Sequence, residues 1–229
     1  MAWPIGSQDP HSAPGGGEDG GVDEALRRAA RDAIGFMPED EGLALYEAAL
    51  DAPADFAWIE IGSYCGKSAI YLGAAARRVG TVLVSIDHHR GSEEHQPGEG
   101  YHDPRLTDER GRVDTLPRFA GAISGAGLND VVLGIAARSE QSAAAWTRPL
   151  GLVFVDGGHS AVAAHADYEG WSPHLVPGGL LIIHDVFEDP AEGGRPPFEI
   201  YERALRSGNF VERSRAGSLR VLDRVGDGM

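Results

Sequence analysis

The sequence contains one cysteine, few basic residues and no long apolar run, and each shortage excludes a class of protein. Cys65 alone cannot form an internal disulfide, so we expect a fold without a disulfide framework in the reducing cytoplasm. Lysine and arginine total 20 against 35 aspartate and glutamate residues. The net charge of −15 argues against a nucleic acid as partner, because phosphate contacts need a basic surface. The absence of about 18 consecutive apolar residues excludes a helical membrane span.

Apolar segments and alanine-rich helical patterns alternate through most of the 229 residues. Residues 1–22 are rich in Gly, Pro, Ser and Asp, so we expect a flexible tail, part of which has a composition compatible with a vector-derived leader. Residues 23–229 are expected to form a single domain. The predicted helices are 23–34, 39–51, 67–78, 110–125, 139–146, 160–175 and 197–207. The predicted strands are 57–61, 81–86, 130–135, 150–155, 179–184, 209–215 and 218–224.

Buried apolar strands that alternate with helices predict a parallel sheet with right-handed crossovers. The last two strands, joined by a turn at Gly217, break that alternation. The fold class is therefore α/β, a Rossmann-like seven-stranded, mostly parallel sheet with one antiparallel strand and helices on both faces. A long polar segment, 87–112, interrupts the pattern and holds four of the nine histidines. Segments of this length in a compact domain are typical of lids, and we expect a lid-like loop.

The stretch "IEIGSYCGKSAIYL" (59–72) has the general form of a phosphate-binding loop. A Walker A loop requires its first glycine at position 61, where this chain has Ile61, so the loop is one residue too short. Glu60, Gly62 and Gly66 instead match the E-x-G-x-x-x-G loop of class I S-adenosylmethionine (SAM) methyltransferases, and the chain resembles that family here. Glycines let the backbone approach a ligand closely, and the helix that follows directs N–H groups at it.

Further residues extend this resemblance. Asp87 ends the second predicted strand, where a carboxylate can accept both ribose hydroxyls. Ser139 follows the third strand, on the adenine side. An acidic residue on the first strand, Glu60, is expected to stay ionised near the sulfonium. The resemblance implies that the cofactor contacts come from Glu60, Gly62, Ser63, Gly66, Ser68, Asp87, His88, Ser139 and Asp156.

The segments "FVDGGH" (154–159) and "PGGLLIIHD" (177–185) carry a narrower resemblance. They are similar to the F-[IV]-D-x-x-H pattern and the Pro-Gly-Gly strand of metal-dependent sugar O-methyltransferases related to the macrocin and mycinamicin tailoring enzymes. The chain also resembles actinobacterial methyltransferases that act on methylmannose polysaccharide precursors. The resemblance implies a small-molecule or oligosaccharide acceptor, Mg²⁺ as the metal and His159 as the catalytic base.

Elementary chemistry supports the same site. Asp156 and Asp185 end neighbouring strands that open into one cleft, and two carboxylates there suit a divalent metal. A metal lowers the pKa of an acceptor hydroxyl, and a histidine within reach then takes the proton. The sugar enzymes have an acidic residue where this chain has His184, and imidazole favours Mn²⁺, Fe²⁺ or Zn²⁺ over Mg²⁺. The expected metal ligands are Asp156, His184 and Asp185, with Glu188 or Asp189 as substitutes for the third.

Several alternatives stay open at the level of sequence. Asp156 could cap the following helix, and His184 could be a core residue. The acceptor could be a catechol or polyketide, although the 87–112 segment has a single Phe, Tyr or Trp residue, Tyr101. A non-catalytic SAM-binding protein and an NTPase remain as other classes. The two N-terminal helices offer an apolar face that could pack on a second copy, so we expect a homo-oligomer.

Overall fold

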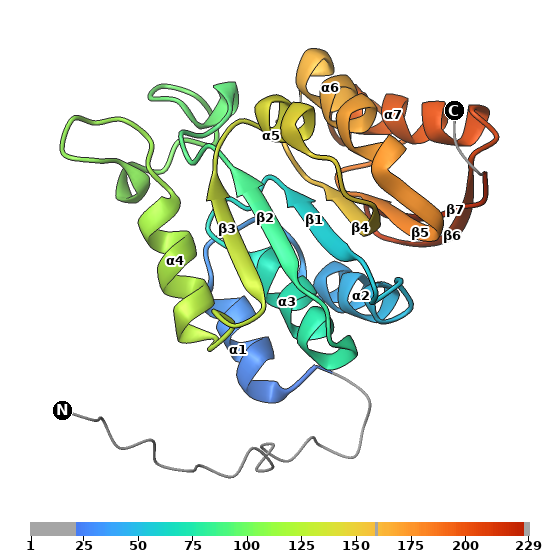
Figure 1. Cartoon of the computed structure of the whole chain (residues 1–229). Coiled ribbons are helices and arrows are strands. Elements are labelled where there is room, and N and C mark those ends of the chain that lie inside the picture. The colour runs from blue at the N-terminus through green and yellow to red at the C-terminus, as the bar shows by residue number, and fades with distance from the viewer. Residues whose placement is uncertain (1–21, 159, 227–229) are drawn as a thin grey trace, which may run out of the picture.

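The computed structural model describes residues 22–158 and 160–226, and its centre is a seven-stranded sheet in the order β3-β2-β1-β4-β5-β7-β6 (Figure 1). The strands are β1 (Ala57–Ile61), β2 (Leu83–Asp87), β3 (Val132–Ala136), β4 (Leu150–Val155), β5 (Leu175–Ile183), β6 (Phe210–Ala216) and β7 (Leu219–Arg224). All neighbouring pairs from β3 to β5 are parallel, and β7 runs antiparallel to both β5 and β6. The predicted fold class is confirmed.

Helices cover both faces of the sheet. The helices α1 (Glu24–Asp32), α2 (Glu39–Leu50), α3 (Lys67–Val79) and α4 (Leu116–Gly125) pack on one face. The helices α5 (Ser139–Ala145), α6 (Ala161–Trp171) and α7 (Arg195–Arg206) pack on the other. Figure 1 shows the two groups on opposite sides of the strands. The central strands β1, β2, β4 and β5 are buried on both faces, which explains their near-continuous apolar sequences, whereas most residues of the edge strands β3 and β6 are exposed.

Alternate residues of the central strands enter two separate hydrophobic cores. Trp58 and Phe154 point into the α1–α4 side, whereas Ile59 and Val153 point into the α5–α7 side, and all four are fully buried. Each such side chain contributes about 1.5–3 kcal/mol by leaving water. Trp171 is fully buried in the second core and Trp146 packs against it, so both tryptophan rings contribute to the packing of that core.

Three boundaries differ from the sequence prediction by four residues or more: β5 begins at Leu175 rather than 179, and proline explains the other two. The helix predicted for 160–175 ends at Trp171, because Pro173 lies in a 3₁₀ turn, Ser172–His174, that leads directly into β5. The helix predicted for 110–125 begins only at Leu116, with Pro117 in its first turn. Residues 110–115 belong to the loop instead, where Val113 forms an isolated bridge with Thr107.

The apolar face of the two N-terminal helices is buried within the chain. Ala30 of α1 and Leu45, Tyr46 and Ala49 of α2 join the core that contains α3. The apolar face that we expected to contact a second copy is therefore part of the core of this chain. The homo-oligomer stays a prediction. No helix in 22–158 or 160–226 has the length and apolar character needed to cross a membrane. The predicted tail, 1–22, lies outside the described residues except for Val22.

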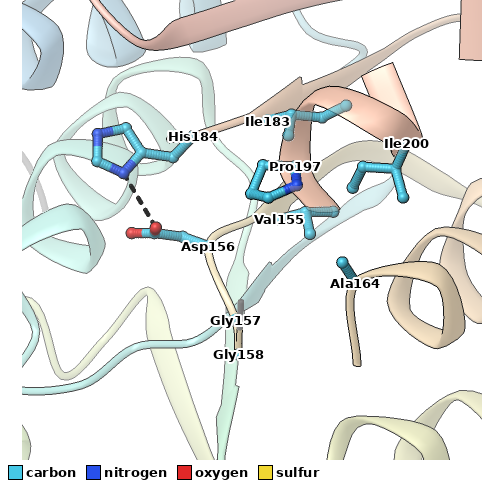
Figure 2. A pocket seen from close by; sticks show the side chains of 9 residues that line it. All are labelled: Val155, Asp156, Gly157, Gly158, Ala164, Ile183, His184, Pro197 and Ile200. Carbon is cyan, nitrogen blue, oxygen red and sulfur yellow. Dashed lines mark hydrogen bonds and ion pairs between the residues drawn. The ribbon is translucent and has the colours of Figure 1, made fainter. Parts of the chain in front are cut away.

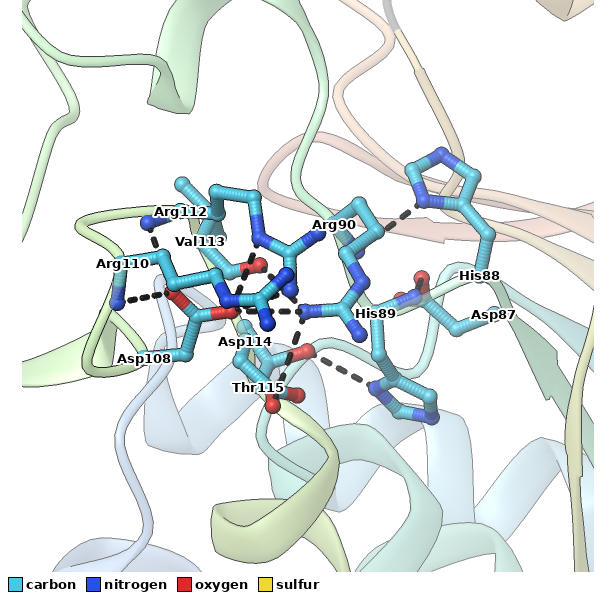
Figure 3. Close-up of polar contacts among 10 residues, drawn as sticks. All are labelled: Asp87, His88, His89, Arg90, Asp108, Arg110, Arg112, Val113, Asp114 and Thr115. Carbon is cyan, nitrogen blue, oxygen red and sulfur yellow. Dashed lines mark hydrogen bonds and ion pairs between the residues drawn. The ribbon is translucent and has the colours of Figure 1, made fainter.

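The predicted lid-like loop extends beyond the carboxyl ends of β2 and β3 (Figure 1). It contains two short 3₁₀ turns, Glu93–His95 and Pro104–Leu106. Polar contacts close its base, as Figure 3 shows: the Arg90 guanidinium lies 3.8 Å from Asp108 and 3.5 Å from Asp114. Arg112 pairs with Asp108 at 2.8 Å. Both ends of the loop are thus tied together where it leaves the sheet.

Candidate active site

The candidate site lies where the order of the parallel strands reverses, between β1 and β4. The chain crosses from β1 to β2 and β3 on one side, and β4 and β5 lie on the other. Ligands of open α/β sheets bind at this point, beyond the carboxyl ends of the strands. Backbone hydrogen bonds continue past the strands here: Asp156 N–H donates to Ile61 O at 2.9 Å, and His184 N–H to Val155 O at 3.1 Å. The predicted residues at these strand ends are therefore held side by side.

The glycine loop is pressed directly against the end of β4. Gly62 has a φ of 90°, and a Cβ atom there would lie 2.0 Å from the carbonyl oxygen of Asp156. Only glycine fits, because both the conformation and the space exclude a side chain. Gly66, with a φ of 92°, precedes the first residue of α3, and no side chain caps that helix. The first N–H groups of α3 are therefore available to a ligand.

Asp87 is oriented by the loops on either side of it. Its Oδ2 accepts a hydrogen bond from Tyr64 N–H at 2.8 Å, and its Oδ1 accepts from His89 N–H at 2.7 Å. The structure thus joins Asp87 to the glycine loop, and its predicted contact with a ribose stays a prediction. His88 is exposed, and its Nδ1 accepts a hydrogen bond from Arg90 N–H at 3.0 Å. Its cofactor contact stays a prediction.

Glu60 differs from the sequence expectation. It is fully buried inside the sheet, where its two oxygens accept hydrogen bonds of 2.6 Å from Ser68 and Ser85. Burial raises the pKa of Glu60 to about 7, so its carboxyl is not held firmly ionised as expected. Glu60 and Ser68 join β1, β2 and α3 beneath the loop, and Ser63 is buried beside them. The predicted contacts of Glu60, Ser63 and Ser68 with a cofactor stay predictions.

The start of α5 is linked to α6 through buried polar groups. Ser139 Oγ accepts a hydrogen bond of 2.8 Å from Trp171 Nε1, while its predicted place beside the adenine is untested. Asp167 of α6 is almost fully buried, and burial raises its pKa to about 6. A Cβ atom on Gly157 would lie 2.7 Å from Asp167 Oδ2. Asp167 was not predicted as a site residue; the available signal was its place between the alanine run and the aromatic residues Tyr168 and Trp171 of the same helix.

Asp156, His184 and Asp185 come together at the ends of β4 and β5. Asp156 and His184 line a small pocket together with residues of α6 and α7 (Figure 2). His184 is 4% exposed, and its Nδ1 lies 3.0 Å from Asp156 Oδ1 and 3.5 Å from Asp185 Oδ2. Burial opposes a charge on His184, but the surrounding carboxylates outweigh burial and raise its pKa to about 12. Asp185 is held in the left-handed region, with a φ of 56°.

Glu41 completes this cluster from the other side of the sheet, and it was missed by sequence reasoning. Its Oε2 accepts a hydrogen bond from His184 Nε2 at 2.6 Å, and its Oε1 accepts from Ser218 N–H at 2.7 Å. These bonds outweigh the effect of burial and lower the pKa of Glu41. An acidic residue on the buried face of the helix predicted for 39–51 was the available signal. Glu41 fixes the imidazole so that Nδ1 faces the two aspartates.

The arrangement fits a divalent metal ion. One ligand atom from each of Asp156, His184 and Asp185 can be chosen so that all three lie within 4.8 Å of one another. Adjacent ligands of an ion with bonds of about 2.1 Å are separated by about 3 Å, close to the Nδ1–oxygen distances here. A carboxylate behind a ligating histidine, as Glu41 stands behind His184, is the usual support for such a ligand.

Two of the sequence alternatives have no support at this site. Ser160, rather than Asp156, caps α6, because its Oγ accepts a hydrogen bond from Ala163 N–H at 3.3 Å. Glu188 pairs with Arg215 at 3.3 Å, and Asp189 accepts a hydrogen bond from Ala191 N–H at 2.9 Å. His184, rather than Glu188 or Asp189, is therefore the candidate for the third metal ligand. His159, the predicted base, lies outside the described residues.

Comparison with known proteins agrees with this geometry. The family described as "Methyltransferase domain" matches residues 59–186, which is more than half of the chain. The chain belongs to this methyltransferase family. The matched segment begins on β1, includes the glycine loop and ends just after the His184–Asp185 pair. The NTPase alternative loses its support.

Several solved structures share the fold of this methyltransferase. The SAH-bound methyltransferase PaMTH1 of Podospora anserina is 14% identical over 92% of this chain and 91% of that chain, with a TM-score of 0.64. The O-methyltransferase TomG of Streptomyces achromogenes, in complex with SAM, is 18% identical over 89% and 91%, with a TM-score of 0.59. An SAH complex of an O-methyltransferase from Bacillus cereus is 18% identical over 88% and 91%, with a TM-score of 0.56. At these identities the comparison establishes the fold.

Proposed function

We propose that this methyltransferase transfers a methyl group from SAM to a hydroxyl of a sugar or oligosaccharide, with a divalent metal in the site. The observation that carries the proposal is the position of His184 between Asp156 and Asp185, at the strand ends that the glycine loop also touches. The glycine loop and the three candidate metal ligands therefore border the same site. The sugar as acceptor rests on the resemblance of the 154–159 and 177–185 segments to sugar enzymes.

The residues around the glycine loop fit SAM. Gly62 and Gly66 leave the two ends of the loop without side chains, and the uncapped start of α3 offers N–H groups to a carboxylate. Asp87, aligned by Tyr64 N–H and His89 N–H, keeps lone pairs for ribose hydroxyls. When bound, SAM supplies a methyl group on a sulfonium; the S–CH₃ bond breaks as the acceptor oxygen forms the new O–CH₃ bond and SAH leaves.

Asp156, His184 and Asp185 would hold the metal, and Glu41 would keep the His184 ring in position. The metal supplies charge that lowers the pKa of a nearby acceptor hydroxyl. A nitrogen ligand beside two carboxylates favours Mn²⁺, Fe²⁺ or Zn²⁺ over the Mg²⁺ that the sugar enzymes imply. We assign the hydroxyl proton to His159, which follows Asp156 by three residues in the sequence.

Calorimetric titration with SAH tests the first half of the proposal. We expect wild-type protein to bind SAH, with a change in heat when Mn²⁺ or Mg²⁺ is present. Asp156→Ala should abolish the metal-dependent change, while Glu188→Ala, which removes an exposed acid nearby, should keep it. Absence of SAH binding by wild type, or an equal metal response in Asp156→Ala, would refute the assignment.

An activity assay tests the second half. Wild type is incubated with SAM and a panel of methyl glycosides and oligosaccharides, and SAH is measured by mass spectrometry. We expect product only with hydroxyl acceptors, and a loss of at least about a hundredfold in kcat for His159→Ala, the range of general-base catalysis. Retention of kcat in His159→Ala would exclude this base. A protein that binds SAH but methylates no acceptor would support the non-catalytic alternative.

A second acceptor class, the catechols and polyketides, is tested beside the sugars because aromatic rings gather at the glycine loop. The loop 87–112 contributes Tyr101, and the fold adds Phe36 and Tyr64 from other segments to the same place, with ring centroids 5.4 Å apart for Phe36–Tyr101 and 5.7 Å for Phe36–Tyr64. The scarcity of Phe, Tyr and Trp in the loop therefore does not argue against an aromatic acceptor.

A further inference from the structure

We propose that the rings of Phe36, Tyr64, His95 and Tyr101 form an acceptor subsite that binds one face of a hexopyranoside ring. We call these four residues the ring cluster. The proposal rests on the proposed function, since it names the subsite through which the sugar would be held for methyl transfer.

The ring cluster is assembled from three separate segments. Phe36 lies between α1 and α2, Tyr64 lies in the glycine loop, and His95 and Tyr101 lie in the lid-like loop. The centroid distances are 5.0 Å for Tyr64–His95, 5.4 Å for Phe36–Tyr101 and 5.7 Å for Phe36–Tyr64. These spacings are those of favourable aromatic pairs. Segments distant in sequence therefore meet in one continuous aromatic surface.

Two members of the ring cluster leave much of their surface open to solvent. Phe36 is 61% exposed and Tyr101 is 56% exposed, although both contact other rings. A grouped exposure of large rings, unlike a single exposed side chain, is typical of a binding surface. Hydrogen bonds hold the loop members in place: Tyr101 N–H donates to Glu94 O at 3.1 Å, and His95 Nδ1 lies 2.7 Å from Ser92 Oγ.

The ring cluster borders the site where methyl transfer would occur. A Cβ atom on Gly158 would lie 3.9 Å from Cβ of Ser92, the residue that bonds His95. Gly158 follows the Asp156–Gly157 turn at the end of β4. On the other side, Tyr64 N–H donates to Asp87. The cluster thus includes one residue of the cofactor loop, Tyr64, and the partner of His95, Ser92, lies next to Gly158.

The mutual tilt of the rings favours a sugar over a flat aromatic acceptor. The interplanar angles are 34° for Phe36–Tyr64, 33° for Tyr64–His95 and 83° for Phe36–Tyr101, so the rings do not form a parallel-sided slot. A puckered pyranose can place C–H groups on tilted faces, while a planar ligand prefers parallel or edge contacts.

Polar groups around the ring cluster also match a polyhydroxylated ligand. Asp103 and Arg105 form a close pair at 2.6 Å and act on Tyr64 through their charges. Burial is the main effect that raises the pKa of Tyr64 to about 12, and the phenol can donate and accept hydrogen bonds. An aromatic surface with an acid, a guanidinium and a phenol beside it offers both stacking and hydroxyl contacts.

Saturation-transfer NMR tests the subsite directly. The probes are methyl α-D-glucopyranoside, methyl α-D-mannopyranoside, methyl β-D-galactopyranoside and catechol, each with SAH-loaded protein. We expect saturation of ring C–H protons for at least one glycoside. Tyr101→Ala and Phe36→Ala should each weaken its binding about tenfold, which corresponds to roughly 1.4 kcal/mol for one lost aromatic contact. Val211→Ala, which truncates an exposed apolar residue on the distant strand β6, should bind as wild type does.

Each other outcome contradicts a defined part of the proposal. Unchanged glycoside binding in Tyr101→Ala and Phe36→Ala, or stronger binding of catechol that depends on these residues, would exclude the sugar subsite. Conversion of a dimer to a monomer by Phe36→Ala in light scattering would show that a second copy covers the rings. SAH binding without binding of any glycoside would overturn the subsite and leave the cofactor assignment intact. Failure of wild type to bind SAH would overturn the proposed function itself.

Discussion

Nε2 of His184 and the carboxylate of Glu41 form a buried hydrogen bond of 2.6 Å between residues 143 positions apart in the chain. The bond joins α2, which covers one face of the sheet, to the end of β5. Glu41 also accepts two hydrogen bonds from Ser218, in the turn between β7 and β6. A single carboxylate thus connects the first helical layer, the candidate metal ligands and the last strand pair.

We expect Glu41→Ala to destabilise the protein by about 2–4 kcal/mol, because buried donors of His184 and Ser218 lose their acceptor. The measurement is urea unfolding followed by circular dichroism. Glu39→Ala, on the same helix, is the matched control: its carboxylate pairs with Arg27 and Arg31 at the surface, so its loss should cost much less stability than the loss of Glu41. Equal effects of both substitutions would contradict a special role for Glu41.

Gly62→Ala should prevent stable folding or cost more than about 3 kcal/mol, because the new Cβ atom would overlap the backbone of Asp156 and Gly157. Thermal unfolding of the purified variant gives the cost. Gly121, inside α4, has no atom within 4 Å of an added Cβ, and Gly121→Ala should stabilise by about 0.5–1 kcal/mol. A stable Gly62→Ala protein that still binds SAH would show that the loop can move away from β4.

The pH dependence of stability should reveal the carboxyl of Glu60. Its pKa in the folded protein is about 7, above the ordinary value of 4.5, so the folded state binds the proton more tightly than the unfolded state does. Stability is therefore lost as pH rises from about 4.5 to 7. Glu60→Gln removes this titrating group. Between pH 5 and 8, the free energy of unfolding should therefore fall by about 2 kcal/mol more in wild type than in Glu60→Gln.

Urea unfolding at a series of pH values measures this difference. Asp167→Asn is the control, since burial raises the pKa of Asp167 only to about 6 and its contribution ends at lower pH. If wild type and Glu60→Gln show parallel stability profiles up to pH 8, the carboxyl of Glu60 is ionised in the fold after all.

The base of the lid-like loop should loosen when Asp108 is removed. Asp108 accepts hydrogen bonds from the backbone N–H groups of Arg110 and Arg112 and pairs with the Arg112 side chain (Figure 3). We expect Asp108→Ala to be cleaved by chymotrypsin after Tyr101 or Leu106 several times faster than wild type, because local opening becomes easier. The neighbouring exposed Glu109→Ala is the control. Equal cleavage of all three proteins would show that these contacts do not hold the loop.

Much of the fold could be predicted because strand burial and glycine spacing are local signals. The five parallel strands appear as short apolar runs, and Gly62 and Gly66 mark the loop in the sequence itself. Boundaries failed where proline ended one pattern before the next began, as between α6 and β5. Within the site, Asp156 and Asp185 could be placed beside each other because adjacent parallel strands end at the same edge.

Side-chain environment was the part that sequence could not supply. Glu60 has the position expected of a cofactor contact, yet the hydroxyls of Ser68 and Ser85 enclose it inside the sheet. Glu41 has no motif and acquires its place only when α2 packs beside β5 and β7. The ring cluster was invisible for the same reason, because Phe36, Tyr64 and Tyr101 come from segments with unrelated local patterns.

The hydrogen bonds of Glu41 also limit how far the chain could be shortened without changing the site. The family match, 59–186, contains the glycine loop and all three candidate metal ligands, but neither Glu41 nor Ser218. A protein trimmed to that segment would keep every recognisable motif and lose the acceptor for His184 Nε2. The segment that matches the family is thus smaller than the set of residues that orients the His184 ring. Grafting the motifs alone onto another scaffold would transfer a histidine without the carboxylate that holds it.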